Sequence, residues 1–140
     1  MWKRLGRFVI AGFVAMVSRT KPGKFLLREM LGRAMSETTL VRHDGLDIRF
    51  STPSILTKYR ALTFSSKEPE TLEWIDGFVR GSTFWDVGAN IGIYSCYASL
   101  SKKCDTVSFE PSVFNLEILA RNIALNNLGD SVSIVPFALS

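Results

Sequence analysis

The second half of the chain alternates between strand-like and helix-like segments, and this alternation constrains the fold more than any other feature. Residues 83–87, 106–109 and 132–137 are short segments rich in apolar and β-branched residues, which favour strands. The segments between them, 93–103 and 112–127, carry apolar residues at helical spacing. Strand, helix, strand, helix and strand within about 55 residues predict a right-handed, parallel βαβαβ unit.

The same pattern predicts which faces of these elements are buried. The strand at 83–87 is mostly apolar, as expected for a parallel strand that is covered on both faces. The helix at 112–127 should end near Gly129, a good C-terminal stop. Its buried side should carry Val113, Leu116, Leu119 and Ile123.

Two further elements are expected before this unit. Residues 39–51 alternate between apolar and polar side chains around Asp44-Gly45, which predicts a β-hairpin with a tight turn. A helix should begin at the serines near Ser65 and end at Gly81. Its buried face should carry Leu72, Ile75, Phe78 and Val79.

Charge is unevenly distributed along the chain. Residues 1–35 hold eight basic side chains and one acidic side chain, a net charge of +7, whereas the remaining residues carry a net charge of −3. A basic head on a mildly acidic body suggests an anionic partner for the head alone. We expect no nucleic-acid partner, because a nucleic-acid enzyme more often carries basic residues across its body.

The basic head has the pattern of an amphipathic helix. Its apolar stripe would comprise Trp2, Leu5, Val9, Phe13 and Met16, and Lys-Pro-Gly at 21–23 would end it before a short second helix at 24–31. The apolar run at 8–17 is too short to span a bilayer. Three alternatives stay open: a helix packed on the body, a helix adsorbed through residues 1–20 to an anionic membrane surface, and a secretion signal, although no Ala-x-Ala site clearly follows. We expect a cytoplasmic protein, with peripheral attachment at the inner membrane face as the alternative that stays open.

One segment carries the chemistry. Asp86-Val-Gly88-Ala-Asn90-Ile-Gly92 joins the first strand of the predicted unit to the following helix, and Glu110 follows the second strand. Glycines allow a ligand to approach the backbone, and the N–H groups at a helix start favour an anionic group. A carboxylate at the tip of the next strand can accept hydrogen bonds from both ribose hydroxyls. The ligand is therefore expected to contain a ribose.

The type of nucleoside follows from Asp86 and from the spacing of the glycines. A buried carboxylate beside the turn would repel the pyrophosphate of a dinucleotide, and G-x-x-x-G differs from the dinucleotide pattern G-x-G-x-x-G. S-adenosylmethionine carries an ammonium and a sulfonium, which a carboxylate attracts. It is the favoured cofactor, and a nucleotide-dependent oxidoreductase stays a weaker alternative. We expect no metal site, because the chain has only two cysteines and one histidine.

Three stretches of this region resemble the FkbM-type S-adenosylmethionine-dependent methyltransferases. They are FWDVGANIGIYS at 84–95, FEPSVFNLEILARNIALNN at 109–127 and VPFALS at 135–140, and the EPET stretch at 68–71 also fits. The likeness covers roughly half of the chain, from about residue 68 to its end. It implies an α/β fold of the Rossmann-like class I methyltransferase type, with S-adenosylmethionine as cofactor.

The resemblance also implies roles for single residues. The turn residues Asp86, Gly88, Asn90 and Gly92 would hold the methionine part of the cofactor, and Glu110 would hold the ribose. Pro111 and Ser112 would lie at the edge of the adenine, and the loop containing Ala138 would approach the adenine from the third strand. Because the family mostly methylates hydroxyl oxygens of sugars, glycolipids and natural products, the implied acceptor is a small-molecule or glycan hydroxyl.

The expected organisation is a helical segment at 1–35, a hairpin and linker at 36–61, and a cofactor-binding methyltransferase domain at 62–140. A doubly wound sheet binds its ligand where the strand order reverses, so this domain is expected to be an incomplete first half, truncated after its third strand. Missing strands would supply the acceptor contacts and any general base, and no catalytic residue is assigned. The first strand would form an open edge at which copies of the chain could associate. The alternative is a non-catalytic fragment whose head binds a membrane or a partner.

Overall fold

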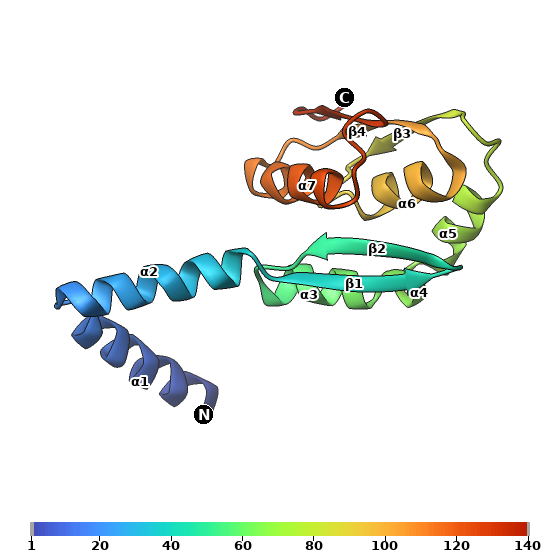
Figure 1. The fold of residues 1–140 in the computed structure, drawn as a ribbon. Helices are drawn as coiled ribbons and strands as arrows, with labels where there is room; N and C mark the ends of the chain where they lie inside the picture. The colour runs from blue at the N-terminus through green and yellow to red at the C-terminus, as the bar shows by residue number, and fades with distance from the viewer. Residues whose placement is uncertain (1, 140) are drawn as a thin grey trace. The chain divides into compact units, whose positions relative to one another are not determined.

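The chain divides into two compact units, an N-terminal unit, Met1–Ser36, and a C-terminal unit, Glu37–Ser140. The computed structural model describes the backbone of residues 2–139 and the side chains of residue 6 and residues 8–139. The secondary structure of both units is drawn in Figure 1.

The N-terminal unit contains two helices, α1 (Trp2–Val17) and α2 (Lys21–Met35). The sequence predicted that residues 21–23 would lie between the two helices, but these residues begin α2. Pro22 lies in the first turn of α2, where its missing N–H costs no hydrogen bond. Thr20 caps this turn by accepting the N–H of Gly23 at 3.1 Å. The second helix therefore extends beyond the predicted 24–31 at both ends. Two residues of the expected apolar stripe, Trp2 and Leu5, have side chains that lie outside the described residues. None of the described helices is long and apolar enough to span a membrane.

The C-terminal unit begins with the predicted hairpin, formed by β1 (Thr38–His43) and β2 (Leu46–Ser51). Asp44 and Gly45 both have positive φ angles, 46° and 74°, which is the backbone of a type I′ turn. Ile48 and Phe50 alternate on one face of β2 and are fully buried. The hairpin prediction is confirmed, and these two side chains supply part of the core.

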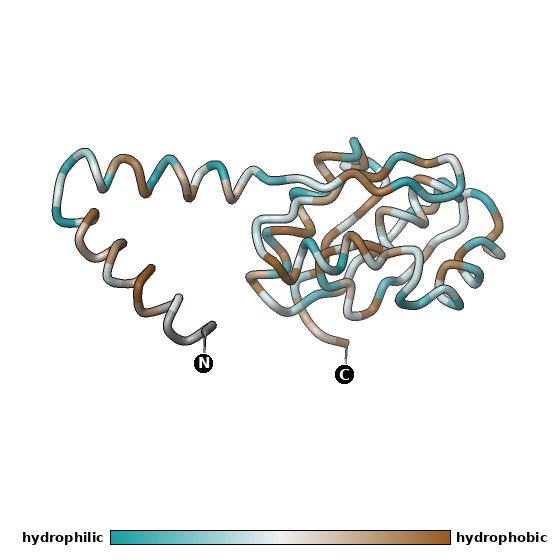
Figure 2. Tube along the Cα trace, turned by 90° about the horizontal axis from the view of Figure 1, so that it is seen from below, coloured by the Kyte–Doolittle hydropathy of each residue, from teal (hydrophilic) through white to brown (hydrophobic). Residues whose placement is uncertain are grey.

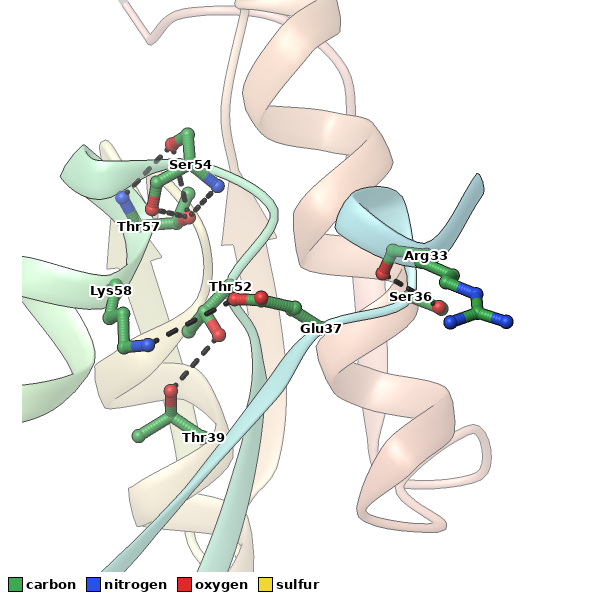
Figure 3. Close-up of polar contacts among 8 residues, drawn as sticks. All are labelled: Arg33, Ser36, Glu37, Thr39, Thr52, Ser54, Thr57 and Lys58. Carbon is green, nitrogen blue, oxygen red and sulfur yellow. Dashed lines mark hydrogen bonds and ion pairs between the residues drawn. The ribbon is translucent and has the colours of Figure 1, made fainter. Parts of the chain in front are cut away.

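Helix α3 (Ile55–Leu62) follows the hairpin and begins at a capping box. Ser54 and Thr57 each accept the backbone N–H of the other residue through their hydroxyl groups, at 3.1 and 3.2 Å (Figure 3). Figure 3 also shows Lys58 of α3 paired with Glu37 at 3.9 Å. These contacts fix the start of α3 beside the first residues of the unit.

The helix expected between residues 65 and 81 is divided into α4 (Phe64–Lys67) and α5 (Pro69–Asp76). Glu68 separates them with an extended φ of −139°, because a residue that precedes proline is excluded from the helical region. Leu72 and Ile75 are buried as expected. Val79 is 78% exposed, so the predicted buried face was wrong at this position.

The remaining elements form the predicted βαβαβ unit. Strands β3 (Thr83–Val87), β4 (Asp105–Phe109) and β5 (Val132–Val135) form a parallel sheet in the order β3-β4-β5. The connecting helices are α6 (Ile93–Lys102) and α7 (Val113–Leu125). Both helices lie on one side of the sheet, between it and the hairpin, and α3 and α4 lie on the far side of the hairpin (Figure 1). The unit is a parallel βαβαβ arrangement of the Rossmann-like α/β class, as the sequence predicted.

Because α6 and α7 cover only one side of the sheet, the expected burial of β3 on both faces was wrong. Phe84 and Asp86 face the helices and are buried, whereas Trp85 and Val87 point to the opposite side and are 60% and 59% exposed. Val113, at the start of α7, is also exposed rather than buried. Leu119 and Ile123 are buried, as predicted for α7.

The end of α7 also differs from the prediction. The helix ends at Leu125, before the expected Gly129. Asn127 takes the left-handed conformation that follows many helices, with a φ of 55°. Asparagine tolerates this conformation better than most residues, so it replaces glycine as the helix stop.

Candidate functional site

The turn between β3 and α6 lies at the carboxyl end of the first strand of the sheet. Gly88, Asn90 and Gly92 have positive φ angles of 81°, 55° and 75°. The N–H groups of Gly88 and Ala89 both donate to the carbonyl of Phe109, the last residue of β4, at 2.9 Å. The turn is therefore held across the carboxyl edge of two neighbouring strands, the position at which sheets of this type bind ligands.

Glu110 joins the next strand to the same turn. Its Oε2 accepts the backbone N–H of Asn90 at 2.7 Å, and its Oε1 accepts the backbone N–H of Ser112 at 2.8 Å. The residue is only 5% exposed. Each carboxylate oxygen has two acceptor sites, so each can still accept a hydrogen bond from a ligand hydroxyl.

Asp86, the first residue of the predicted motif, lies beneath the turn on the side that faces α6. It is buried, and its Oδ2 accepts a hydrogen bond from the Ser95 hydroxyl, which also contacts the Ser108 hydroxyl at 2.8 Å. Burial raises the pKa of Asp86, and the hydrogen bond from Ser95 acts in the opposite direction. The nearby charge of Glu110 adds to the rise.

The side chain of Asn90 contains a polar atom that the protein does not satisfy. Its Oδ1 is buried and has no hydrogen-bond partner, the one such side-chain atom among the described residues. An unsatisfied buried acceptor costs about 1–3 kcal/mol. A ligand that donates a hydrogen bond to this oxygen would remove the cost.

A cavity of about 200 Å³ opens beside the turn, and Gly88, Asn90 and Ile91 line one side of it. Residues of α3, α4 and α6 complete the lining, among them Arg60, Lys67 and Tyr94. The cavity therefore brings cationic side chains within reach of the backbone of the turn.

Glu68, between α4 and α5, also lines this cavity. Its carboxylate accepts the Tyr94 hydroxyl at 2.9 Å and pairs with the Lys67 ammonium at 3.1 Å. The hydrogen bonds from Lys67 and Tyr94 lower the pKa of Glu68. Burial, together with the hydrogen bond to Glu68, raises the pKa of Tyr94, so its hydroxyl stays a neutral donor.

Two side chains of α7 hold the turn in place from below. Asn122 donates to the carbonyl of Ile91 and accepts the N–H of Ser51, in each case at 2.7 Å, so it joins the turn to the hairpin. A Cβ placed on Gly92 would lie 2.1 Å from a methyl carbon of Leu119. The last position of the motif is therefore restricted to glycine both by its φ angle and by its contact with α7.

The structure separates the eight site residues that the sequence suggested into groups. Gly88 and Asn90 line the cavity, Gly92 ends the turn against Leu119 of α7, Asp86 lies beneath the turn and Glu110 lies at its side. Of the remaining three, Ser112 is the N-cap of α7 and contacts Glu110, and Pro111 and Ala138 are exposed.

Sequence reasoning gave no role to several residues around the turn. Glu68 entered only as part of the EPET stretch, and Tyr94 entered only as part of the stretch at 84–95. Arg60 and Asn122 carry no local motif, because contacts between distant parts of the chain bring them to the turn. Among the described residues, no group of three or more His, Cys, Asp or Glu side chains could hold a metal ion.

Comparisons with known proteins support the fold. No protein-family model matches the chain, and no curated protein sequence matches it. Among solved structures it resembles PH0793 of Pyrococcus horikoshii, with a TM-score of 0.55 and 17% sequence identity over 74% of this chain. It also resembles TYW2 of P. horikoshii in complex with MeSAdo, with a TM-score of 0.53 and 18% identity over 74% of this chain.

A third similar structure is TYW2 of M. jannaschii in complex with AdoMet, with a TM-score of 0.51 and 18% identity. It is matched over 72% of this chain and 43% of its own length. The chain spans 37% of the length of each of the two P. horikoshii proteins. At these identities the comparisons establish a shared fold.

Proposed function

We propose that the C-terminal unit binds S-adenosylmethionine and forms the cofactor-binding part of a methyltransferase. The observation that carries the proposal is the hydrogen bond between the Glu110 carboxylate and the Asn90 amide. It brings an acidic strand end and a glycine-containing turn together at the carboxyl edge of a parallel sheet. In folds of this kind that edge binds nucleoside ligands, with the acidic residue on the ribose.

The electrostatic character of the site supports a cationic nucleoside. Two carboxylates lie at the turn, those of Asp86 and Glu110, and a third at the cavity, that of Glu68, is already paired with Lys67. Two like charges at 4 Å repel each other by about 4 kcal/mol at an effective dielectric constant of 20, so a pyrophosphate is disfavoured here. S-adenosylmethionine carries a sulfonium and an ammonium, which these carboxylates attract.

The cavity beside the turn suits the amino-acid end of this ligand. The unpaired Asn90 Oδ1 is an acceptor for an ammonium N–H, and Arg60 and Lys67 can pair with a carboxylate. A Cβ at Gly88 would have no atom within 4 Å, so this position leaves open space beside the turn, and its φ angle of 81° would strain any residue with a Cβ. The residues present therefore fit the ligand.

In this proposal each part of the ligand has its own residues. Asp86, Gly88, Asn90 and Gly92 hold the methionine part, and Glu110 accepts from the ribose hydroxyls. For the adenine, the proposal follows the resemblance to the FkbM-type enzymes and assigns Pro111, Ser112 and Ala138.

The acceptor is proposed to be a hydroxyl oxygen of a sugar, glycolipid or natural product, again from the resemblance to the FkbM-type enzymes. When bound, S-adenosylmethionine supplies an electrophilic methyl group on its sulfonium. The contribution of this chain is to bind and orient that group, because correct positioning accounts for much of the rate of a two-substrate transfer.

Isothermal titration calorimetry with S-adenosylhomocysteine and with NAD tests the proposal. The chain should bind S-adenosylhomocysteine with one site per chain and should not bind NAD. Glu110→Gln should weaken this binding by about 10- to 100-fold, because hydrogen bonds to a charged group contribute about 1.5–3 kcal/mol.

Glu117→Gln is the matched control, because Glu117 lies on α7 and pairs with Arg121 at the surface. It should leave the affinity unchanged. NAD binding without S-adenosylhomocysteine binding would favour a nucleotide-dependent oxidoreductase. A folded chain that binds neither ligand would favour a non-catalytic binding module.

A further inference from the structure

We propose that the N-terminal unit, Met1–Ser36, anchors the protein to the surface of anionic lipid bilayers. The proposal rests on residues that take no part in the cofactor site, so it can fail or hold independently of the proposed function. It follows from the exposed side chains of the two helices, from their charge and from the length of the apolar run.

Helix α1 exposes a continuous series of large apolar side chains. Phe8 is 77% exposed and Phe13 is 58% exposed. Val9, Ile10 and Met16, which lie between or beside them, are exposed as well. Figure 2 shows hydrophobic residues along much of this helix. Single exposed apolar residues are normal on a protein surface, but a contiguous set of this kind marks an interaction site.

Helix α2 exposes apolar and basic side chains that lie mainly on different faces, with Phe25 beside the basic residues and Arg33 beside the apolar ones. Leu26 and Met30 are four residues apart, so they share one face of the helix, and both are exposed. Lys21 and Arg28 are seven residues apart and share another face, where both are exposed. Hydrophobic and hydrophilic residues alternate along α2 in Figure 2. A helix with a basic face and an apolar face is typical of binding at a membrane surface.

Charge complementarity indicates which partner binds the N-terminal unit. The first 35 residues carry a net charge of +7, whereas the rest of the chain carries −3. An anionic bilayer offers negative headgroups to the basic side chains and, directly beneath them, an apolar layer for Phe8 and Phe13. A nucleic acid also offers negative groups to the basic side chains, but it leaves the apolar side chains in water.

The length of the apolar run favours a surface position. Residues 8–17 are apolar throughout, whereas a membrane-spanning helix needs about 20 such residues. Among the described residues no helix meets the requirements for a span. The apolar side chains of α1 can therefore enter the headgroup boundary without crossing the bilayer.

Flotation of the full chain with lipid vesicles tests the proposal. The wild type should float with vesicles of phosphatidylcholine and phosphatidylglycerol in equal amounts and should not float with phosphatidylcholine alone. Binding should weaken as the ionic strength rises from about 0.1 M to about 1 M, because the screening length falls from about 10 to 3 Å.

Two sets of variants separate the apolar and the basic contributions. Phe13→Asp should weaken binding at least about tenfold, and Val79→Asp, at an exposed apolar site of the C-terminal unit, is its matched control. Lys24→Glu with Arg28→Glu should also weaken binding at least about tenfold, since each basic residue near an anionic surface contributes about fivefold. The matched control is Arg80→Glu with Lys103→Glu, which makes the same charge change on the C-terminal unit. Circular dichroism confirms that each variant is folded.

Equal flotation with neutral and anionic vesicles would overturn the proposal, as would wild-type protein that floats with neither. Equal losses in the test and control variants would also contradict it. Binding of the wild type to a DNA duplex without flotation on vesicles would assign the basic residues to nucleic acid instead. The salt dependence is measured on the wild type alone, so it keeps the proposal testable even if a variant fails to fold.

Discussion

The Glu110 carboxylate accepts the backbone N–H of Asn90 at 2.7 Å, and this contact joins the end of β4 to the turn that follows β3. The same carboxylate accepts the N–H of Ser112, the N-cap of α7. One buried side chain thus fixes three backbone segments at the carboxyl edge of the sheet. The turn, the strand end and the helix start are therefore in place before a ligand binds.

Gly92→Ala should destabilise the protein. The alanine methyl would lie 2.1 Å from a carbon of Leu119, and the φ angle of 75° is unfavourable for any residue with a Cβ. The combined cost of overpacking and backbone strain is about 2–6 kcal/mol in the free energy of unfolding. Urea denaturation measures it, with Gly129→Ala as control because no atom lies within 4 Å of a Cβ at that position. Similar losses in both variants would contradict the close contact between the turn and α7.

Asn122→Leu should cost more stability than Asn126→Leu, although both side chains join α7 to the hairpin. Asn122 is fully buried, and its loss leaves the N–H of Ser51 and the carbonyl of Ile91 without partners. Each unsatisfied group costs about 1–3 kcal/mol. Asn126 bonds the backbone of Arg49 in a more exposed position, where water can replace it. Thermal unfolding of the two variants measures the difference, and an equal effect would show that the buried bonds contribute little.

The sequence predicted the parts of this fold that depend on local chemistry. Asp44-Gly45 forms the expected turn because both residues tolerate positive φ angles, and the glycine-containing segment after β3 forms the expected strand-to-helix turn. The order of strands and helices followed from their periodicity. The site residues identified from the motif lie at or beneath one turn because parallel strands end at the same edge of a sheet.

Other features depend on which surfaces meet, and a sequence pattern does not contain that information. Trp85 and Val87 have the composition of a strand buried on both faces, but both helices cross on the other side of the sheet. Glu68 and Asn122 reach the turn only through contacts between elements far apart in the chain. The split between α4 and α5 has a local cause in Pro69, which is a favourable first-turn residue but also excludes Glu68 from a helix.

Asp86 and Glu68 should change stability with pH in opposite directions. Burial raises the pKa of Asp86 above 3.8, so its contribution is fully present below that pH and is lost as the pH rises through its folded pKa. Hydrogen bonds from Lys67 and Tyr94 lower the pKa of Glu68, so its contribution is present above about pH 4.5 and is lost as the pH falls through its folded pKa.

Unfolding free energies of Asp86→Asn and Glu68→Gln across this range separate the two effects. The stability advantage of the wild type over Asp86→Asn should decrease from pH 4 to pH 7, by at most about 1.4 kcal/mol for each pH unit in that interval. Its advantage over Glu68→Gln should increase as the pH rises from 3 to 5. Parallel pH profiles for the wild type and both variants would contradict the assigned pKa directions.

Within the part of the chain that the structure describes, β3 has an open edge and one uncovered face, which should allow copies of the chain to associate. Strand β3 ends the sheet order, and Trp85 and Val87 are exposed on the face away from the helices. Exposed edges and apolar patches of this kind are pairing sites. Sedimentation velocity should show concentration-dependent association of the wild type that Trp85→Lys reduces. Val113→Lys, at an exposed apolar position on α7, should leave it unchanged.

A titration with S-adenosylhomocysteine, followed through the backbone amide signals in two-dimensional NMR spectra, tests the central claim most directly. The account predicts saturable shifts of the amides of the residues assigned to the ligand, namely the turn with Asp86, residues 86–92, the segment that Glu110 holds beside it, residues 110–112, and Ala138. The same shifts should be absent with NAD and should need a higher ligand concentration in Glu110→Gln. A folded chain without saturable shifts at residues 88–92 and 110–112 would contradict the account.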